Sequence, residues 1–312
     1  MLSKVAERVY WTARYLERIE STARLISIYD QLLFDLPRSV NLSWYNLITI
    51  NSLEEAFDAH YSVRDERNVM RFMLGDEANS SSVISSLRAI RENVRTTRDV
   101  LPEEIWEMTN ELYMFVQENM QQGVGRSKRH QFLQSIIKGC QQMLGMLYGN
   151  MPHDTAWLFM RMGLNLERAD MTSRNLDAGM AAMLEIEDEE TAVNSHQIIW
   201  GNVLRALNAD QSYRRKTHLA VRGGVVVEYL LDDEELPRSI RHCLRALANS
   251  CNKLPKGKAV AQKLREIEEG MAHDFAEDNL DYRVREYLNQ LQIEIAKVHH
   301  LIGATWFPQC LV

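Results

Sequence analysis

The chain has 312 residues, of which 46% are hydrophobic and 25% charged, a balance typical of a folded globular protein. Its formal net charge of −7 disfavours a general nucleic-acid binder, because such proteins normally carry an excess of lysine and arginine. The N-terminus lacks the apolar core of a signal peptide, and no window approaches the roughly 18 apolar residues of a membrane-spanning helix. We therefore expect a cytoplasmic protein that binds neither nucleic acid nor membrane.

The predicted elements are helices. In the segment 5–33 the apolar residues recur three, four or seven positions apart, which indicates an amphipathic helix. The same periodicity predicts helices over 133–147 and 287–302. Residues 225–227 are three consecutive valines and the best strand candidate, but they follow two glycines and have no partner run, so we interpret them as the start of a buried helix. The sequence predicts an all-α fold.

An internal repeat organises these helices. The segment LERIESTAR at 16–24 returns 150 positions later as LERADMTSR at 166–174. Further matches follow in the same order with an offset between 150 and 157: Trp44 and Asn46 with Trp200 and Asn202, Asp76 with Asp233, Ser82 and Leu87 with Ser239 and Leu244, and Leu147 and Gly149 with Leu301 and Gly303.

We therefore predict a helical bundle formed by two tandem repeats of about 150 residues, with five to six helices each, related by a pseudo-twofold axis. The first repeat would span 1–151 and the second 152–312, with the junction near Pro152. Whether they form one continuous bundle or two domains is left open.

The repeated motif supplies the first candidate site. Residues 17, 20 and 24 share one narrow stripe of a helix, as do 167, 170 and 174. Pairs of opposite charge within one helix contribute only about 0.2–0.5 kcal/mol each, too little to explain why the whole pattern is repeated. The motif is either an interhelical network of buried charges across the pseudo-twofold axis or a ligand or catalytic site. Its residues are Glu17, Arg18, Glu20, Arg24, Glu167, Arg168, Asp170 and Arg174.

A second candidate is a run of four arginines, Arg88, Arg91, Arg95 and Arg98. Spacings of three, four and three predict four guanidinium groups along one helix face, which suits phosphate, carboxylate or an acidic partner. The second repeat keeps only Arg245, at the place of Arg88. The alternative is a solvated basic face, partly neutralised by Glu92.

Two weaker patterns are set aside. Glu266, Glu269, His273 and Glu277 form a helical stripe that could ligate a divalent metal. A di-iron bundle would repeat a Glu-x-x-His motif on two helices, which the chain lacks, so we interpret the stripe as a solvated acidic face. The glycine-containing segment 123–129 lacks the Walker spacing, and we interpret it as a basic turn between helices. No metal and no cofactor is predicted.

The four cysteines, Cys140, Cys243, Cys251 and Cys310, are far apart and form no CxxC pair. This spacing disfavours a zinc site or a disulfide framework and predicts reduced thiols.

The paired LER segments, together with RENVR at 91–95 and E-x-W-E-x-x-N at 104–110, resemble the bacterial alpha-E family over nearly the whole chain. The resemblance implies an α-helical fold in which the Glu-Arg motif falls on Glu17-Arg18 and Glu167-Arg168, intact in both places. Similar proteins tend to be encoded beside, or fused to, circularly permuted ATP-grasp proteins, often with transglutaminase-like peptidases nearby.

The function implied by the resemblance is that of a helical accessory partner of a circularly permuted ATP-grasp, amide-ligase-like system that forms or modifies peptides. The lack of a recognisable catalytic motif favours a non-catalytic subunit. The alternative is an enzyme acting on a peptide-like or anionic substrate in a cleft between the repeats, with Glu17 or Glu167 as acid or base. A third possibility is a carrier or sensor that binds an acidic metabolite on the Arg88–Arg98 face.

Overall fold

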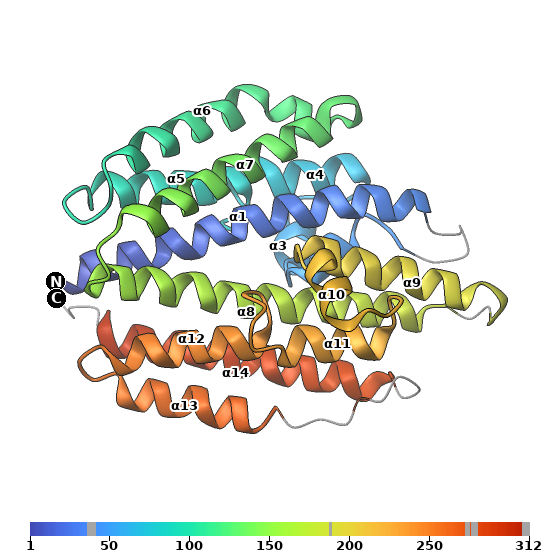
Figure 1. Ribbon diagram of the computed structural model, residues 1–312. Coiled ribbons are helices and arrows are strands. Elements are labelled where there is room, and N and C mark those ends of the chain that lie inside the picture. Colours follow the sequence, from blue (N-terminus) through green and yellow to red (C-terminus); the bar gives the residue numbers. More distant parts are fainter. Residues whose placement is uncertain (36–41, 187–188, 272–274, 276–279, 308–312) are drawn as a thin grey trace.

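The computed structural model describes the whole chain except residues 36–41, 187–188, 272–274, 276–279 and 308–312 (Figure 1). The described residues form helices, turns and coil without a strand, which confirms the all-α prediction. The helices of the first half are α1 (Ser3–Asp35), α2 (Asn46–Ile50), α3 (Glu54–Asp58), α4 (Glu66–Leu74), α5 (Val83–Arg95), α6 (Glu104–Val124) and α7 (Arg126–Asn150). Those of the second half are α8 (Thr155–Leu184), α9 (Glu189–Ala206), α10 (Asp210–Thr217), α11 (Gly223–Asp232), α12 (Ile240–Asn252), α13 (Lys258–Glu269) and α14 (Tyr282–Trp306).

The prediction of five to six helices per half is wrong: the described residues form seven in each half. The difference comes from short elements, since α2 and α3 have five residues each and α10 has eight. Helices of one or two turns are too short to show a helical period in the sequence. The three valines do lie in a helix, because α11 begins at Gly223.

Two long helices occupy the centre of the molecule, where α1 (33 residues) lies along α8 (30 residues) (Figure 1). Helix α1 also packs against α5 and α7, and α8 packs in the same way against α12 and α14. The outer helices α6 and α13 cover these pairs at the top and bottom of Figure 1. This arrangement places the two LER segments on neighbouring central helices.

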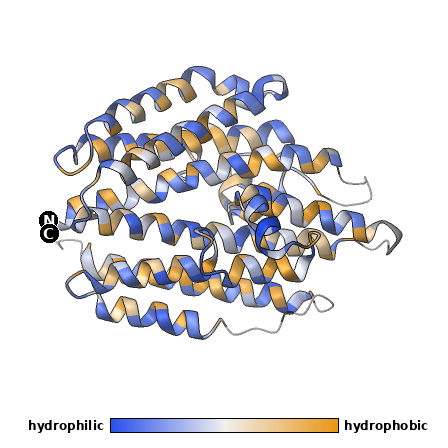
Figure 2. Ribbon diagram, viewed as in Figure 1, coloured by the Kyte–Doolittle hydropathy of each residue, from blue (hydrophilic) through white to orange (hydrophobic). Residues whose placement is uncertain are grey.

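A glycine allows the central helices to approach closely. A Cβ atom at Gly163 of α8 would lie 2.1 Å from the carbonyl oxygen of Tyr10 in α1, far inside van der Waals contact. Hydrophobic and hydrophilic residues alternate along the helices at helical spacing (Figure 2), and the buried side chains form a hydrophobic core that includes residues from both halves.

Cys140, Cys243 and Cys251 are free thiols, as predicted, and all three are buried in this core. Cys310 lies outside the described residues. Burial raises the pKa of Cys243 and of Cys251 to about 12, so both thiols are protonated at neutral pH. None of the described helices combines the length and the apolar character needed to cross a membrane.

Candidate functional site

The two motif glutamates face each other across the interface of α1 and α8. Glu17 is 0% exposed and Glu167 is 1% exposed, so both carboxylates are removed from water. An isolated buried carboxylate is costly, and each therefore requires charged partners.

Each glutamate is paired with the arginine of the other motif. Arg18 Nε donates a hydrogen bond to Glu167 Oε1 over 2.6 Å, and Arg168 Nε donates to Glu17 Oε2 over 2.9 Å. The Glu-Arg dipeptide of one central helix thus exchanges partners with that of the other. This is the geometry of the interhelical network that the sequence offered as one of two interpretations.

A second arginine donates a hydrogen bond to each carboxylate. Arg14 Nε, one turn before Arg18, donates to Glu167 Oε2 over 2.7 Å. Arg238, in the turn between α11 and α12, donates to Glu17 Oε1. Sequence reasoning missed both, because Arg14 lies outside the repeated segment and Arg238 is 221 positions from its partner.

The arginines keep both carboxylates ionised. Burial alone would raise the pKa of Glu167. Arg18 and Arg14 outweigh this effect and lower the pKa to about 2. Burial likewise raises the pKa of Glu17, and Arg238 and Arg168 outweigh burial and hold it below the usual range. A carboxylate that is already ionised and saturated with donors is a poor proton donor or acceptor near neutral pH.

The remaining motif acids extend the network outward. Glu20 accepts from Arg24 Nη2 of the same helix over 2.8 Å and pairs with Arg238 over 3.5 Å. Asp170 Oδ2 accepts from Arg174 Nε over 3.0 Å. The structure therefore brings all eight predicted motif residues to the α1–α8 interface and its rim.

A polar cavity enclosing about 450 Å³ of space, part of it open to solvent, adjoins the Glu167 side of this network. Its lining includes Arg18 from α1 and Asp170 and Arg174 from α8. The cavity is the place where motif side chains can meet a ligand.

The predicted arginine face is shorter than expected. Helix α5 ends at Arg95 with Thr96 as its C-cap, so Arg98 lies in the following turn and the prediction of four arginines on one helix face is wrong. The spacing alone does not reveal where the helix ends. Arg88 pairs with Glu77, and Arg95 Nη2 donates to Glu92 Oε1 over 2.8 Å.

The other two arginines pack against helix α6. The Arg91 guanidinium lies 5.8 Å from the ring centre of Trp106, and its Nε donates to Asn110 Oδ1 over 2.6 Å. Arg98 lies 4.1 Å from the ring centre of Trp106. The segments 91–95 and 104–110, which carried part of the family resemblance, thus contact each other through cation–π and hydrogen-bonding interactions.

The acidic stripe and the glycine-containing segment 123–129 are only partly as the sequence predicted. Glu266 and Glu269 lie on α13, whereas His273 and Glu277 lie outside the described residues. The expected basic turn over 123–129 is wrong in extent, since only Gly125 separates α6 from α7. Arg129 lies within α7, is 1% exposed, and donates to the carbonyl oxygen of Gly123 over 3.0 Å.

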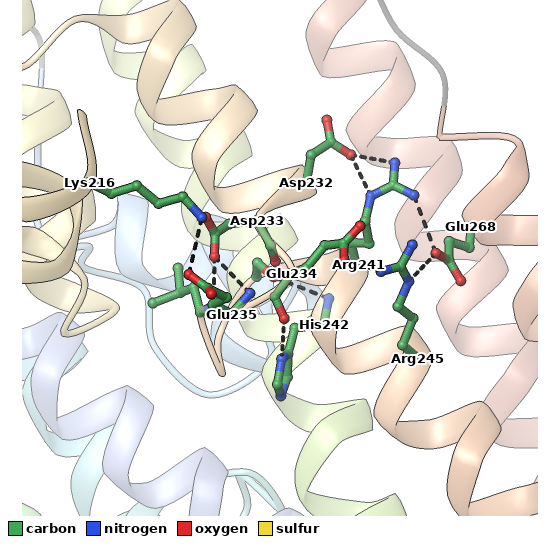
Figure 3. Close-up of polar contacts among 11 residues, drawn as sticks. Lys216, Asp232, Asp233, Glu234, Glu235, Arg241, His242, Arg245 and Glu268 are labelled. Carbon is green, nitrogen blue, oxygen red and sulfur yellow. Dashed lines mark hydrogen bonds and ion pairs between the residues drawn. The ribbon is translucent and has the colours of Figure 1, made fainter.

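A charged cluster that the sequence did not indicate connects α10 to α13 in the second half (Figure 3). Its carboxylates come from residues 232–235 and from Glu268 of α13, and each is paired with a cation. The pairs are Lys216 with Asp233 and Glu235, Arg241 with Asp232 and Glu268, and Arg245 with Glu234 and Glu268. Because each of these carboxylates already has a cationic partner, we interpret the cluster as a set of contacts that hold these helices together.

The fold and the site define an all-helical protein built around an exchange of Glu-Arg pairs between two central helices. The chain belongs to the Alpha-E family, described as a predicted alpha-helical domain with a conserved ER motif, which matches residues 1–307. An uncharacterised protein of Mycobacterium bovis and one of Mycobacterium tuberculosis are each 20% identical to it over 284 residues, covering 85% of this chain and 31% of theirs. The chain thus spans about a third of the length of these curated relatives. No solved structure matches it.

Proposed function

We propose that the chain is a non-catalytic helical accessory protein of a circularly permuted ATP-grasp, amide-ligase-like system that forms or modifies peptides. The observation that carries this proposal is the saturation of both motif glutamates: each is buried and ionised and accepts hydrogen bonds from two arginines. Groups held in this way build a rigid interface between helices rather than transfer protons.

The relatives give a second line of support. In them the matched region makes up 31% of a longer polypeptide, so a unit of this kind occurs joined to other sequence. A helical unit found within longer chains suits a role beside another functional component.

We also propose that the chain consists of two tandem repeats, 1–151 and 152–312, packed about a pseudo-twofold axis. Matched positions make the same contacts in both halves: Ser82 and Ser239 are the N-caps of α5 and α12, and Arg88 pairs with Glu77 as Arg245 pairs with Glu234. Helices α5 and α12 have 13 residues each, and α7 and α14 have 25 each.

The accessory role is tested with a circularly permuted ATP-grasp protein from the same genome. We expect the two purified proteins to co-sediment in analytical ultracentrifugation at micromolar concentration and to co-purify through a tag on either one. A transglutaminase-like peptidase from the same genome is tested in the same way as a further partner. No association with the ATP-grasp protein at micromolar concentration would contradict the proposal.

One observation favours a second candidate, an enzyme acting on a peptide-like or anionic substrate between the repeats: the polar cavity beside Glu167 is lined from both halves. Glu167→Gln separates the two functions when it is compared with Glu17→Gln in the reconstituted system. Loss of product at an unchanged melting temperature for Glu167→Gln alone would support an enzyme. Equal falls in melting temperature for both variants would support the structural role.

A further inference from the structure

The cavity beside Glu167 has mixed polar and charged walls. It lies between α1, α4, α8 and the turns before α3 and α5, and it spans about 450 Å³, part of it open to solvent. The polar side chains that line it are Arg18, Thr22, Asn51, Ser81, Glu167, Asp170 and Arg174. An enclosed space with a few convergent polar groups is typical of a small-molecule site.

A comparison of the two halves explains why this space is not filled by protein. In the second half, Arg238 immediately precedes the N-cap Ser239 and reaches Glu17 and Glu20. In the first half the residue before the N-cap Ser82 is Ser81, whose short side chain lines the cavity. This correspondence rests on the proposed tandem repeat.

Arg238 supplies the second guanidinium group to Glu17, but a residue at a different position supplies it to Glu167. Glu167 receives its second guanidinium from Arg14, and the residue 150 positions after Arg14 is Leu164. The first half thus replaces the charge but not the volume of the missing arginine. The space therefore remains beside a carboxylate that is already neutralised.

The cavity walls keep unused hydrogen-bonding capacity. Arg174 donates through Nε to Asp170 and through Nη1 to Ser52 Oγ, over 2.9 Å in the second case. Among the described residues, Arg174 Nη2, Arg18 Nη1 and Asp170 Oδ1 have no hydrogen-bond partner. Two donors and one acceptor are therefore free beside the same cavity.

The wall charges select the ligand class. Glu167 is already paired with Arg14 and Arg18, so the groups left to meet a ligand are guanidinium nitrogens of Arg18 and Arg174 and the Oδ1 atom of Asp170, and a ligand with a single charge uses only one of these two sides. A molecule with both charges a few ångströms apart gains on both sides. Leu53, Met73 and Met171 form the apolar part of the lining, where an aliphatic side chain fits.

We propose that this cavity binds a small zwitterion of the α-amino acid class. The ligand carboxylate accepts hydrogen bonds from Arg174 and Arg18, its ammonium group donates to Asp170, and its side chain packs on Leu53 and Met73. The second half cannot form the same site because Arg238 occupies the corresponding space. Around Glu17 the Glu-Arg motif thus only holds the helices together, whereas around Glu167 it also forms one wall of a binding site.

Isothermal titration calorimetry of the full chain tests this proposal with leucine, methionine, alanine and glutamate as probes. We expect saturable binding of an aliphatic amino acid, and no binding of propionate or propylamine, each of which carries only one of the two charges. Binding of propionate or propylamine as tight as that of the amino acid would overturn the zwitterion assignment, and so would a lack of heat with every amino acid.

Ser81→Arg supplies the matched variant, because it places in the first half the arginine that the second half already has. We expect it to abolish amino-acid binding while the melting temperature is unchanged or higher, whereas Ser81→Ala keeps the wild-type affinity.

Asp170→Asn, at a side chain that is 19% exposed, should weaken binding by about tenfold or more even if Ser81→Arg does not fold. Wild-type affinity in a folded Ser81→Arg or Asp170→Asn protein would contradict the proposed site. Failure of this binding leaves the accessory role standing, since co-sedimentation with the partner is measured without an amino acid.

Discussion

Glu17 accepts hydrogen bonds or ion pairs from Arg168, Arg238 and Ser21, the last over 3.2 Å. Glu17→Gln removes the carboxylate that pairs with Arg168 and leaves the largely buried Arg238 guanidinium only its longer contact with Glu20. We expect it to lower the free energy of unfolding by about 3–5 kcal/mol, as removal of one partner of a buried ion pair does. Urea unfolding followed by circular dichroism measures this change. Glu92→Gln removes an exposed carboxylate that pairs with the exposed Arg95 and should leave stability unchanged. Similar small effects for both variants would refute a stabilising network.

His299 gives the protein a pH-dependent contact with the buried Tyr10. Its Nδ1 lies 2.9 Å from the Tyr10 hydroxyl, and burial, assisted by Arg14, lowers its pKa from 6.5 to about 4. Because the unfolded chain binds this proton more readily, the stability contributed by neutral His299 is complete above pH 6.5 and is lost as pH falls toward 4. We expect the melting temperature to fall through this window.

His299→Asn should flatten that part of the profile, and the same change at the exposed His130 should not. A second fall, from the buried carboxylates Glu17 and Glu167, should follow in both variants as pH drops below 4.5, because their folded-state pKa values are depressed. An unchanged slope above pH 4.5 in His299→Asn would show that this histidine does not control it.

The Tyr29 hydroxyl is buried and has no hydrogen-bond partner among the residues that the structure describes. Its side chain lines an apolar hollow of about 670 Å³ between α1, α2, α8 and α9. Tyr29→Phe should therefore stabilise the chain by about 1 kcal/mol or leave it unchanged, since it removes an unsatisfied polar group. Tyr213→Phe deletes a hydroxyl that donates to the carbonyl oxygen of Ala220 over 3.1 Å and should destabilise it. The melting temperatures of both variants test this prediction. A lower melting temperature in Tyr29→Phe would mean that the Tyr29 hydroxyl has a hydrogen-bond partner.

Among the elements, the contact between α1 and α8 depends on Gly163, where a Cβ would collide with the backbone of Tyr10. A backbone atom cannot move aside as a flexible side chain can. We expect Gly163→Ala to cost about 1–3 kcal/mol of unfolding free energy by forcing the central helices apart. Gly145→Ala on the exposed face of α7, where a new Cβ meets nothing within 4 Å, should instead stabilise the protein by about 0.5–1 kcal/mol. Equal effects of the two substitutions in chemical denaturation would exclude tight packing at the crossing.

The helices differ in how far the sequence predicted them. Periodicity revealed α1, α7 and α14, because long amphipathic helices repeat one buried face many times. It did not reveal α2, α3 or the end of α5, since single turns carry no repeat and the boundary at Arg95 depends on the turn that follows. The motif stripe identified Glu17 and Glu167 and offered a buried network as one of two interpretations. Arg14 and Arg238 were missed because a helical pattern does not show which distant residue reaches it.

At the scale of the whole molecule, the interface of α1 and α8 determines whether a half can exist alone. A fragment of residues 1–151 would expose the face of α1 that packs on α8 and would leave Glu17 without Arg168 and Arg238. Unpaired buried charge and exposed apolar surface both oppose folding. We expect the fragments 1–151 and 152–312 to lack a cooperative thermal transition separately and to regain one when mixed at equal concentration.

Scanning calorimetry and analytical ultracentrifugation check this expectation. Intact protein that is cleaved after folding, at a protease site inserted between α7 and α8, serves as the control and should sediment as one particle, because the ion pairs of Glu17 and Glu167 still cross the cut. A monomeric, cooperatively folded 1–151 fragment would instead mean that each repeat is a separate domain. In that case the Glu-Arg pairs would hold together two repeats that fold independently, and Glu17→Gln would separate the two repeats without unfolding either one.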